Sequence, residues 1–283
     1  MKKILFSLVL FIIVLFSSLS NAQSKFTINV IGGYSIPMGD FNTPINVNTG
    51  SSLVSKYSED WPYSMKNGFN VGAIGKLSLG KTGNFRLTFG LNYNSFSNTG
   101  TVNNFYYTAP PPPENFNSKS SLSNDGAKNI FATQPATRIF DPKVSLITIS
   151  LGGEYAFLPK GNINPFVGLD ITSSFWGGSF KFTPSDTGIY RDQTMKSEAR
   201  FGLQMNGGCE FKLSKSIGLV AGLKCNFANL VGKGQDDASE IGPNEVDLGD
   251  KEHGIIPSRN VMYLQAYAGF SFYFGFPKTT PKK

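Results

Sequence analysis

The stretch from Arg200 to Phe227 most constrains the fold, because apolar and polar side chains alternate along both of its halves. A period of two residues is typical of a β-strand, whose successive side chains point to opposite faces of a sheet. A short polar link, Ser214 to Ser216, separates the two halves. The stretch therefore predicts a β-hairpin with one apolar and one polar face. The apolar face carries Phe201, Leu203, Met205, Cys209, Phe211 and Leu213, then Ile217, Leu219, Ala221, Leu223, Cys225 and Phe227.

Six further stretches alternate in the same way, which gives eight predicted strands in all. The six cover residues 26–36, 69–79, 85–93, 147–157, 167–175 and 262–274. The connections between consecutive strands are long and short in turn, so all four long ones fall at one end of an up-and-down sheet. Strands of about ten residues can cross a bilayer at a tilt. The pattern predicts an all-β fold, an eight-stranded antiparallel transmembrane β-barrel.

Alternation alone also fits a soluble, lipocalin-like barrel whose apolar face lines a cavity. Two features favour the opposite arrangement: no predicted apolar face carries a charge, and every predicted strand has a glycine on its polar face. Glycine makes room where eight strands curve around a crowded interior. We therefore expect the apolar face to contact lipid. The glycines are Gly33, Gly72, Gly90, Gly152, Gly168, Gly202, Gly218 and Gly269.

The two ends of the chain lie outside the predicted barrel. Residues 1–22 have two lysines, an apolar run and small residues before Gln23, which predicts a cleaved secretory signal peptide. The barrel domain is expected to cover residues 23–276, and residues 277–283 form a short tail. No later segment is apolar for 18 residues, so no membrane-spanning helix is expected.

The charge of the mature chain is only modestly basic. Removing Lys2 and Lys3 leaves 24 basic and 19 acidic residues, a net charge of +5. The basic residues are scattered and do not cluster with stacking aromatic residues. This distribution gives no sign of nucleic-acid binding.

The predicted polar face carries a nearly balanced set of charges. A conducting or substrate-binding lining would need such groups, but eight strands leave an interior that side chains fill, which favours a hydrogen-bonded polar core. Arg86 and Glu154 fall near the short-turn ends of neighbouring strands, so we expect them to pair. The full set is Lys76, Arg86, Arg200, Lys212 and Lys224 with Glu154, Asp170 and Glu210.

The two cysteines of an exported chain could form a disulfide. If the hairpin turn centres on Lys215, Cys209 pairs with Ala221 and Cys225 with Met205. The sulfur atoms are then four residues out of register, roughly 13 Å apart. We expect both to remain thiols on the apolar face.

Three short segments resemble the porin-family outer-membrane β-barrel domain of Gram-negative bacteria: Gly32 to Phe41, Asn164 to Gly168, and the closing Phe272 to Gly275. The resemblance spans the mature chain as a pattern of strands and turns and carries over no catalytic residue. It implies location in the cell outer membrane, with long loops outside and both termini in the periplasm. The implied partners are outer-membrane lipids, lipopolysaccharide and the barrel-insertion machinery. The tail after the last aromatic strand departs from the commonest ending.

The single histidine, His253, raises the question of catalysis, because some small barrels hydrolyse lipids or proteins with a histidine near the outer rim. It lies in the last long loop beside charged residues, and no nucleophile is placed near it by spacing. We therefore expect a solvated loop residue and no enzyme, and we assign no catalytic or cofactor-binding residue.

The same loop, residues 233–253, is acidic. Its oxygen ligands suit Ca²⁺, but their spacing matches no calcium-loop pattern, so a hydrated acidic loop is favoured and no metal ligand is assigned. The acidic residues are Asp236, Asp237, Glu240, Glu245, Asp247, Asp250 and Glu252.

Four aromatic residues near the outer strand ends are expected to form a belt at the headgroup layer: Trp61, Tyr93, Phe175 and Trp176.

The leading hypothesis is a non-enzymatic outer-membrane barrel that presents long surface loops for surface interaction or envelope integrity. Its unknown partner would be extracellular or part of the envelope. The alternatives are a narrow pore for small solutes, a lipid-modifying enzyme that uses His253, and a soluble carrier.

Overall fold

A computed structural model describes most of residues 26–275. The described residues are 26–42, 65–80, 82–98, 100–105, 136–184, 191–234, 245–246, 248–251 and 258–275. Within these ranges no helix has the length and apolar character needed to cross a bilayer.

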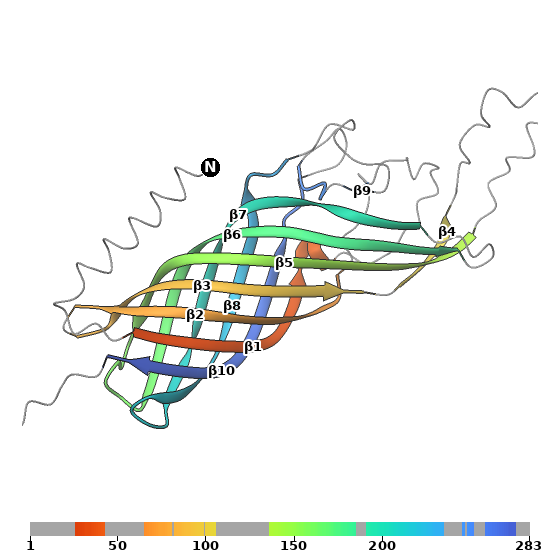
Figure 1. Cartoon of the computed structure of the whole chain (residues 1–283). Coiled ribbons are helices and arrows are strands. Elements are labelled where there is room, and N and C mark those ends of the chain that lie inside the picture. The colour runs from red at the N-terminus through yellow and green to blue at the C-terminus, as the bar shows by residue number, and fades with distance from the viewer. Residues whose placement is uncertain are drawn as a thin grey trace, which may run out of the picture.

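Eight antiparallel strands form one closed barrel (Figure 1). Neighbours in sequence pair with each other, β1 pairs with β10, and β3 pairs with β5. The strands are β1 (Phe26–Met38), β2 (Asn67–Leu79), β3 (Phe85–Ser97), β5 (Ala136–Ala156), β6 (Ile163–Pro184), β7 (Arg191–Lys212), β8 (Ile217–Val231) and β10 (Met262–Phe274). This architecture confirms the predicted eight-stranded up-and-down barrel.

Three short elements lie at the long-loop end, where the long connections are. The 3-10 helix η1 (Gly39–Asn42) follows β1 directly. Strand β4 (Gly100–Phe105) pairs with the first part of β5, beyond the end of the β3–β5 pairing. Strand β9 (Glu245–Val246) pairs in parallel with β7. The opposite end, the short-turn end, contains the β2–β3, β5–β6 and β7–β8 links.

Strands β5, β6 and β7 are much longer than predicted. They have 21, 22 and 22 residues, whereas β1, β2, β3 and β10 have 13 each. Figure 1 shows them running past the other strands at the long-loop end. The loop expected from Trp176 to Ala199 is therefore strand over most of its range. The loop expected from Ser97 to Lys143 is strand at Gly100–Phe105 and from Ala136 onward, and most of the remainder lies outside the described residues. Gly177 and Gly178 interrupt the alternation after Trp176, and strands outside a bilayer need no apolar outer face.

The register of the β7–β8 hairpin matches the prediction. Cys209 lies opposite Ala221, and Cys225 lies opposite Met205. Both cysteines are free thiols.

The two faces of the wall have opposite polarity. Outward side chains such as Phe69, Leu151 and Ile171 are exposed and apolar, whereas inward ones such as Asn29, Thr148 and Gln265 are polar and buried. A soluble carrier with an apolar cavity would show the reverse. The outer surface is that of a membrane-spanning barrel, as expected.

Glycine on the inner face allows the strands to approach closely. A Cβ atom on Gly269 would overlap the backbone of Val30 on β1, and one on Gly33 would overlap Ala266 on β10. At Gly32, which points outward, the nearest atom would be 3.7 Å away. Between β1 and β10 the close backbone approach is therefore on the inner face.

Candidate functional site

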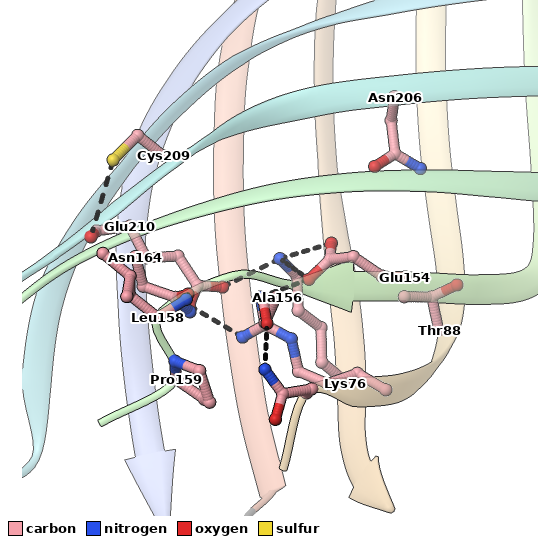
Figure 2. A network of polar contacts seen from close by, with 12 residues as sticks. Lys76, Thr88, Glu154, Ala156, Leu158, Pro159, Asn164, Asn206, Cys209 and Glu210 are labelled. Carbon is pink, nitrogen blue, oxygen red and sulfur yellow. Dashed lines mark hydrogen bonds and ion pairs between the residues drawn. The ribbon is translucent and has the colours of Figure 1, made fainter. Parts of the chain in front are cut away.

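Four charged side chains cross the interior near the short-turn end. Lys76 on β2 lies between Glu154 on β5 and Glu210 on β7 (Figure 2), and Arg86 on β3 contacts the same two acids. The Lys76 Nζ atom is 2.8 Å from both carboxylates, and Arg86 Nη1 is 2.8 Å from Glu210. Arg86 also contacts Glu154, which confirms the predicted pair. We call these four residues the ion quartet.

The ion quartet ties together strands that do not pair with one another. β2 and β7 are separated around the barrel, so the Lys76–Glu210 bond bridges the lumen. The Asn164 side chain donates a further hydrogen bond of 3.1 Å to Glu210. Each cation is shared by both anions, and all four side chains are buried. The quartet therefore closes the interior at this end and leaves none of its charges unpaired.

Neutral groups satisfy the next charge along the axis. Asp170 accepts hydrogen bonds from Thr88 (2.5 Å), Gln204 (2.8 Å) and Asn206 (2.9 Å). A buried carboxylate with three donors is stable without a cation in direct contact.

Lys224 is a further buried cation of the barrel interior. It donates to Asn92 at 3.3 Å and lies 5.3 Å from the ring centre of Tyr267. This contact has the geometry of a cation–π interaction.

Lys212 differs from its predicted role in the interior. Its ammonium donates to the carbonyl of Pro159 at 2.6 Å, in the β5–β6 link. Residue 212 is the last of β7, so its side chain reaches the turn instead of the lumen.

Apolar side chains on the inner face fill the lumen beside the ion quartet, which the sequence analysis missed. Ile31, Phe166, Val220 and Tyr267 form a buried cluster. Lys76 lies 3.8 Å from the ring centre of Phe166. A signal was present, because each occupies an inward position whose neighbours on the same face are polar residues or glycines.

A larger apolar cluster closes the long-loop end, and we call it the mouth cluster. Phe41 from η1 contacts Phe96 and Trp176, with ring centres 4.9 and 6.2 Å apart. Connections between strands as well as the strands themselves contribute to it. Its members are Phe41, Met65, Phe96, Val144, Leu146, Trp176, Phe180, Met195, Ala228, Leu248, Val261 and Tyr263.

Trp176 was wrongly predicted to lie in an outer aromatic belt. It is 1% exposed and belongs to the mouth cluster. Phe175 points outward, so the next residue of the strand has to point inward. Tyr93 and Phe175 are exposed on the outer face as expected, and Trp61 lies outside the described residues.

Asp250 fastens the β8–β10 connection over the mouth. Its carboxylate accepts from Arg200 Nε at 2.9 Å and from Asn229 at 3.0 Å. Two residues earlier, Leu248 enters the mouth cluster, and its backbone N–H donates to Glu198 at 3.2 Å. Glu198 also contacts Arg200. Arg200 is therefore held by an acid of the connection and by one of its own strand.

The prediction of a hydrated acidic loop was wrong for Asp250, whose side chain is buried (0% exposed). Glu245, in β9, is exposed; the other acids of that loop and His253 lie outside the described residues. Within the described part of the chain, no three His, Cys, Asp or Glu residues are placed to hold a metal ion.

A scan against protein-family models and a search of curated proteins find no match. Solved structures similar to this chain include a major outer membrane protein from Thermus thermophilus, with 13% identity, 89% of this chain and 99% of that chain covered, and a TM-score of 0.44. Neisserial surface protein A has 13% identity, coverage of 89% and 98%, and a TM-score of 0.38. Ail of Yersinia pestis has 11% identity, coverage of 88% and 97%, and a TM-score of 0.30.

Removing one charge of the ion quartet should destabilise the barrel strongly. Glu210→Gln leaves two buried cations facing Glu154 alone, and breaking a buried pair in this way costs about 3–5 kcal/mol. The double variant Lys76→Met/Glu154→Leu keeps charge balance and the Arg86–Glu210 pair, so its free energy of unfolding should fall less than that of Glu210→Gln. Urea unfolding in lipid vesicles measures both. An equal loss in the two variants would show that packing, not charge balance, is decisive.

Asp250→Asn should release the β8–β10 connection and leave the barrel wall intact, because it weakens the bonds to Arg200 without touching the ion quartet. Limited proteolysis should cut within residues 232–261 several times faster than in the unchanged protein. Because Arg200 keeps its contact with Glu198, the melting temperature of the barrel should fall less than in Glu210→Gln. Lys251→Gln, an exposed neighbour, serves as the control, and equal cleavage of Asp250→Asn and the control would refute a fastening role.

Closed strand pairing, an apolar outer surface and a filled polar interior lead to one assignment: the chain is a small eight-stranded β-barrel of the outer-membrane type.

Proposed function

We propose that this protein is a non-enzymatic integral outer-membrane barrel that displays its long connections at the cell surface, for interaction with a partner or for envelope integrity. One observation carries this proposal: β5, β6 and β7 continue well past the barrel while both ends of its lumen are filled. About ten residues of strand cross a bilayer, so roughly half of each long strand extends beyond it.

The extended part of the sheet has two different sides. Phe180 and Met195 are buried in the mouth cluster, whereas Lys143 and Lys181 are exposed. β9 pairs with β7 and thereby covers part of its edge. A rigid sheet covered on one side is a suitable support for binding loops.

Export and orientation are part of the same proposal. Residues 1–22 would be removed as a signal peptide, residues 23–276 would form the barrel domain, and residues 277–283 would remain as a periplasmic tail. The short-turn end then faces the periplasm. Because the strand number is even, both termini lie at this same end.

A narrow pore is the second candidate, because part of the interior lacks polar partners. Among the described residues, Asn29 has no hydrogen-bond partner for either side-chain polar atom, and Asn70, Asn92, Asn94 and Ser271 each leave one atom unpaired. Buried polar atoms of this kind usually bind internal water. These polar residues lie between the ion quartet at one end and the mouth cluster at the other. We therefore favour an interior that can hold water but is closed at both ends.

Surface display can be tested in cells that carry a small epitope after Lys283. The protein should fractionate with the outer membrane and migrate differently on gels before and after boiling. External protease should cut the long connections and leave the epitope intact. Release without detergent, or an epitope accessible from outside, would contradict the proposal.

The pore candidate can be tested in planar bilayers with the refolded full chain. We expect no steady single-channel conductance, because the ion quartet and the mouth cluster both obstruct the lumen. Protein-free bilayers and boiled protein serve as controls. Reproducible channels that disappear on boiling would contradict the display proposal and favour a pore.

A further inference from the structure

The charges of this chain are distributed unequally between the two ends of the barrel. The short-turn links, residues 80–84, 157–162 and 213–216, each contain one lysine and no acid. The tail, residues 277–283, adds three lysines and again no acid. Three acids, Glu154, Asp170 and Glu210, are inside the barrel, and the other 16 of the 19 belong to the long connections and the strand ends next to them.

The described lysines at the short-turn end lie on adjoining turns. The backbone N–H of Lys212 donates to Asn162 at 2.8 Å, so the β7–β8 hairpin contacts the link that contains Lys160. The Lys212 side chain reaches Pro159 in the same link. Lys160 and Lys215 are exposed and lie on these two adjoining turns, with Lys212 engaged between them. We call Lys160 and Lys215 the lysine rim.

The end of the last strand adjoins the lysine rim as well. Tyr273 at the end of β10 donates its backbone N–H to Ser216, next to Lys215, at 2.9 Å. The chain thus leaves the barrel beside the rim.

The nearest acids do not neutralise the lysine rim. Glu154 and Glu210 are buried and are engaged by Lys76 and Arg86. Asp170 is deeper in the lumen and is satisfied by its own donors. In the described part of the short-turn end, no exposed acid lies beside Lys160 and Lys215.

The depth of the lysine rim indicates its ligand. Phe85 and Leu213 are 65% and 66% exposed on the outer wall, so the lipid-facing surface continues to the last residues of the strands. Tyr155 packs edge-on against both Phe85 and Phe157, with ring centres 5.1 and 5.2 Å apart. Aromatic residues of this kind anchor at the headgroup layer. Lys215 is two residues beyond Leu213 and Lys160 is three beyond Phe157, so their flexible side chains reach the phosphate level.

We propose that the lysine rim binds the headgroups of anionic phospholipids in the periplasmic leaflet, of the phosphatidylglycerol or cardiolipin class. The inference rests on the orientation given under Proposed function. Phosphodiesters lie at the depth of the rim, whereas the carboxylates of a cell-wall polymer lie farther from the bilayer. Each lysine near an anionic membrane surface is worth about 1 kcal/mol, close to a fivefold preference.

The test compares lipid selectivity in nanodiscs that contain the refolded full chain. Phosphatidylcholine discs receive a small fraction of spin-labelled phosphatidylglycerol or spin-labelled phosphatidylcholine, and the protein-bound fraction gives their relative association constant. The unchanged protein should prefer phosphatidylglycerol, and Lys160→Gln/Lys215→Gln should lower this preference about fivefold or more. High salt should weaken the preference of the unchanged protein, because screening acts on exposed charges.

The matched control removes two exposed lysines from the long-loop end, Lys66→Gln/Lys251→Gln. It makes the same change in net charge and should leave the preference nearly unchanged. No preference in the unchanged protein, or equal losses in the two double variants, would overturn the proposal. Binding to isolated cell-wall sacculi without lipid preference would also overturn it, in favour of a cell-wall contact.

Failure of this inference is distinguishable from failure of the proposed function. A protein that inserts into discs and shows the expected orientation in cells, yet does not discriminate between the two lipids, lacks only the lipid site. A protein whose tail is exposed to the outside of cells contradicts the display proposal itself.

Discussion

The pairing of β3 with β5 is the constraint on which the rest of the structure depends. It closes the sheet, so every strand within the barrel has a partner on both sides and no backbone edge faces lipid. A bilayer offers no water to hydrogen-bond an unpaired edge, which makes closure obligatory for a spanning sheet. Closure around only eight strands then leaves an interior that side chains have to fill. The polar row of each strand is thus forced together with the polar rows of all the others.

The ion quartet and the mouth cluster are two solutions to this crowding, set by what lies beyond each end. At the short-turn end the links are too short to fold inward, so the strands fill the lumen with their own charged side chains. At the long-loop end the connections are long enough to contribute apolar residues, and Phe41 and Leu248 enter from outside the wall. Asp250 then holds one connection in place through Arg200. The barrel is fastened by charge at one end and mainly by apolar packing at the other.

The sequence predicted the features that the bilayer imposes on the strands, but few of the features outside the bilayer. Alternation identified the strands, the outer face and the β7–β8 register, and the matching strand ends identified the pairing of Arg86 with Glu154. Beyond the membrane the outer face no longer has to be apolar, so the extensions of β5, β6 and β7 left no comparable pattern. Trp176 could have been placed by strict alternation from Phe175. The burial of Asp250 could not, because it depends on a contact with Arg200, fifty residues away in the chain.

The positions of Cys209 and Cys225 affect how the barrel has to fold. A disulfide between them would place residue 209 opposite 225 instead of 221, a slip of four residues. An even slip keeps apolar side chains outside and polar ones inside, so hydrophobic patterning does not oppose it. The tight turn at Ser214 to Ser216, the contacts of the interior and the pairing with β6 and β10 select the native alignment. A disulfide between Cys209 and Cys225 would therefore hold the hairpin in a misaligned sheet, whereas the native register keeps the two thiols apart.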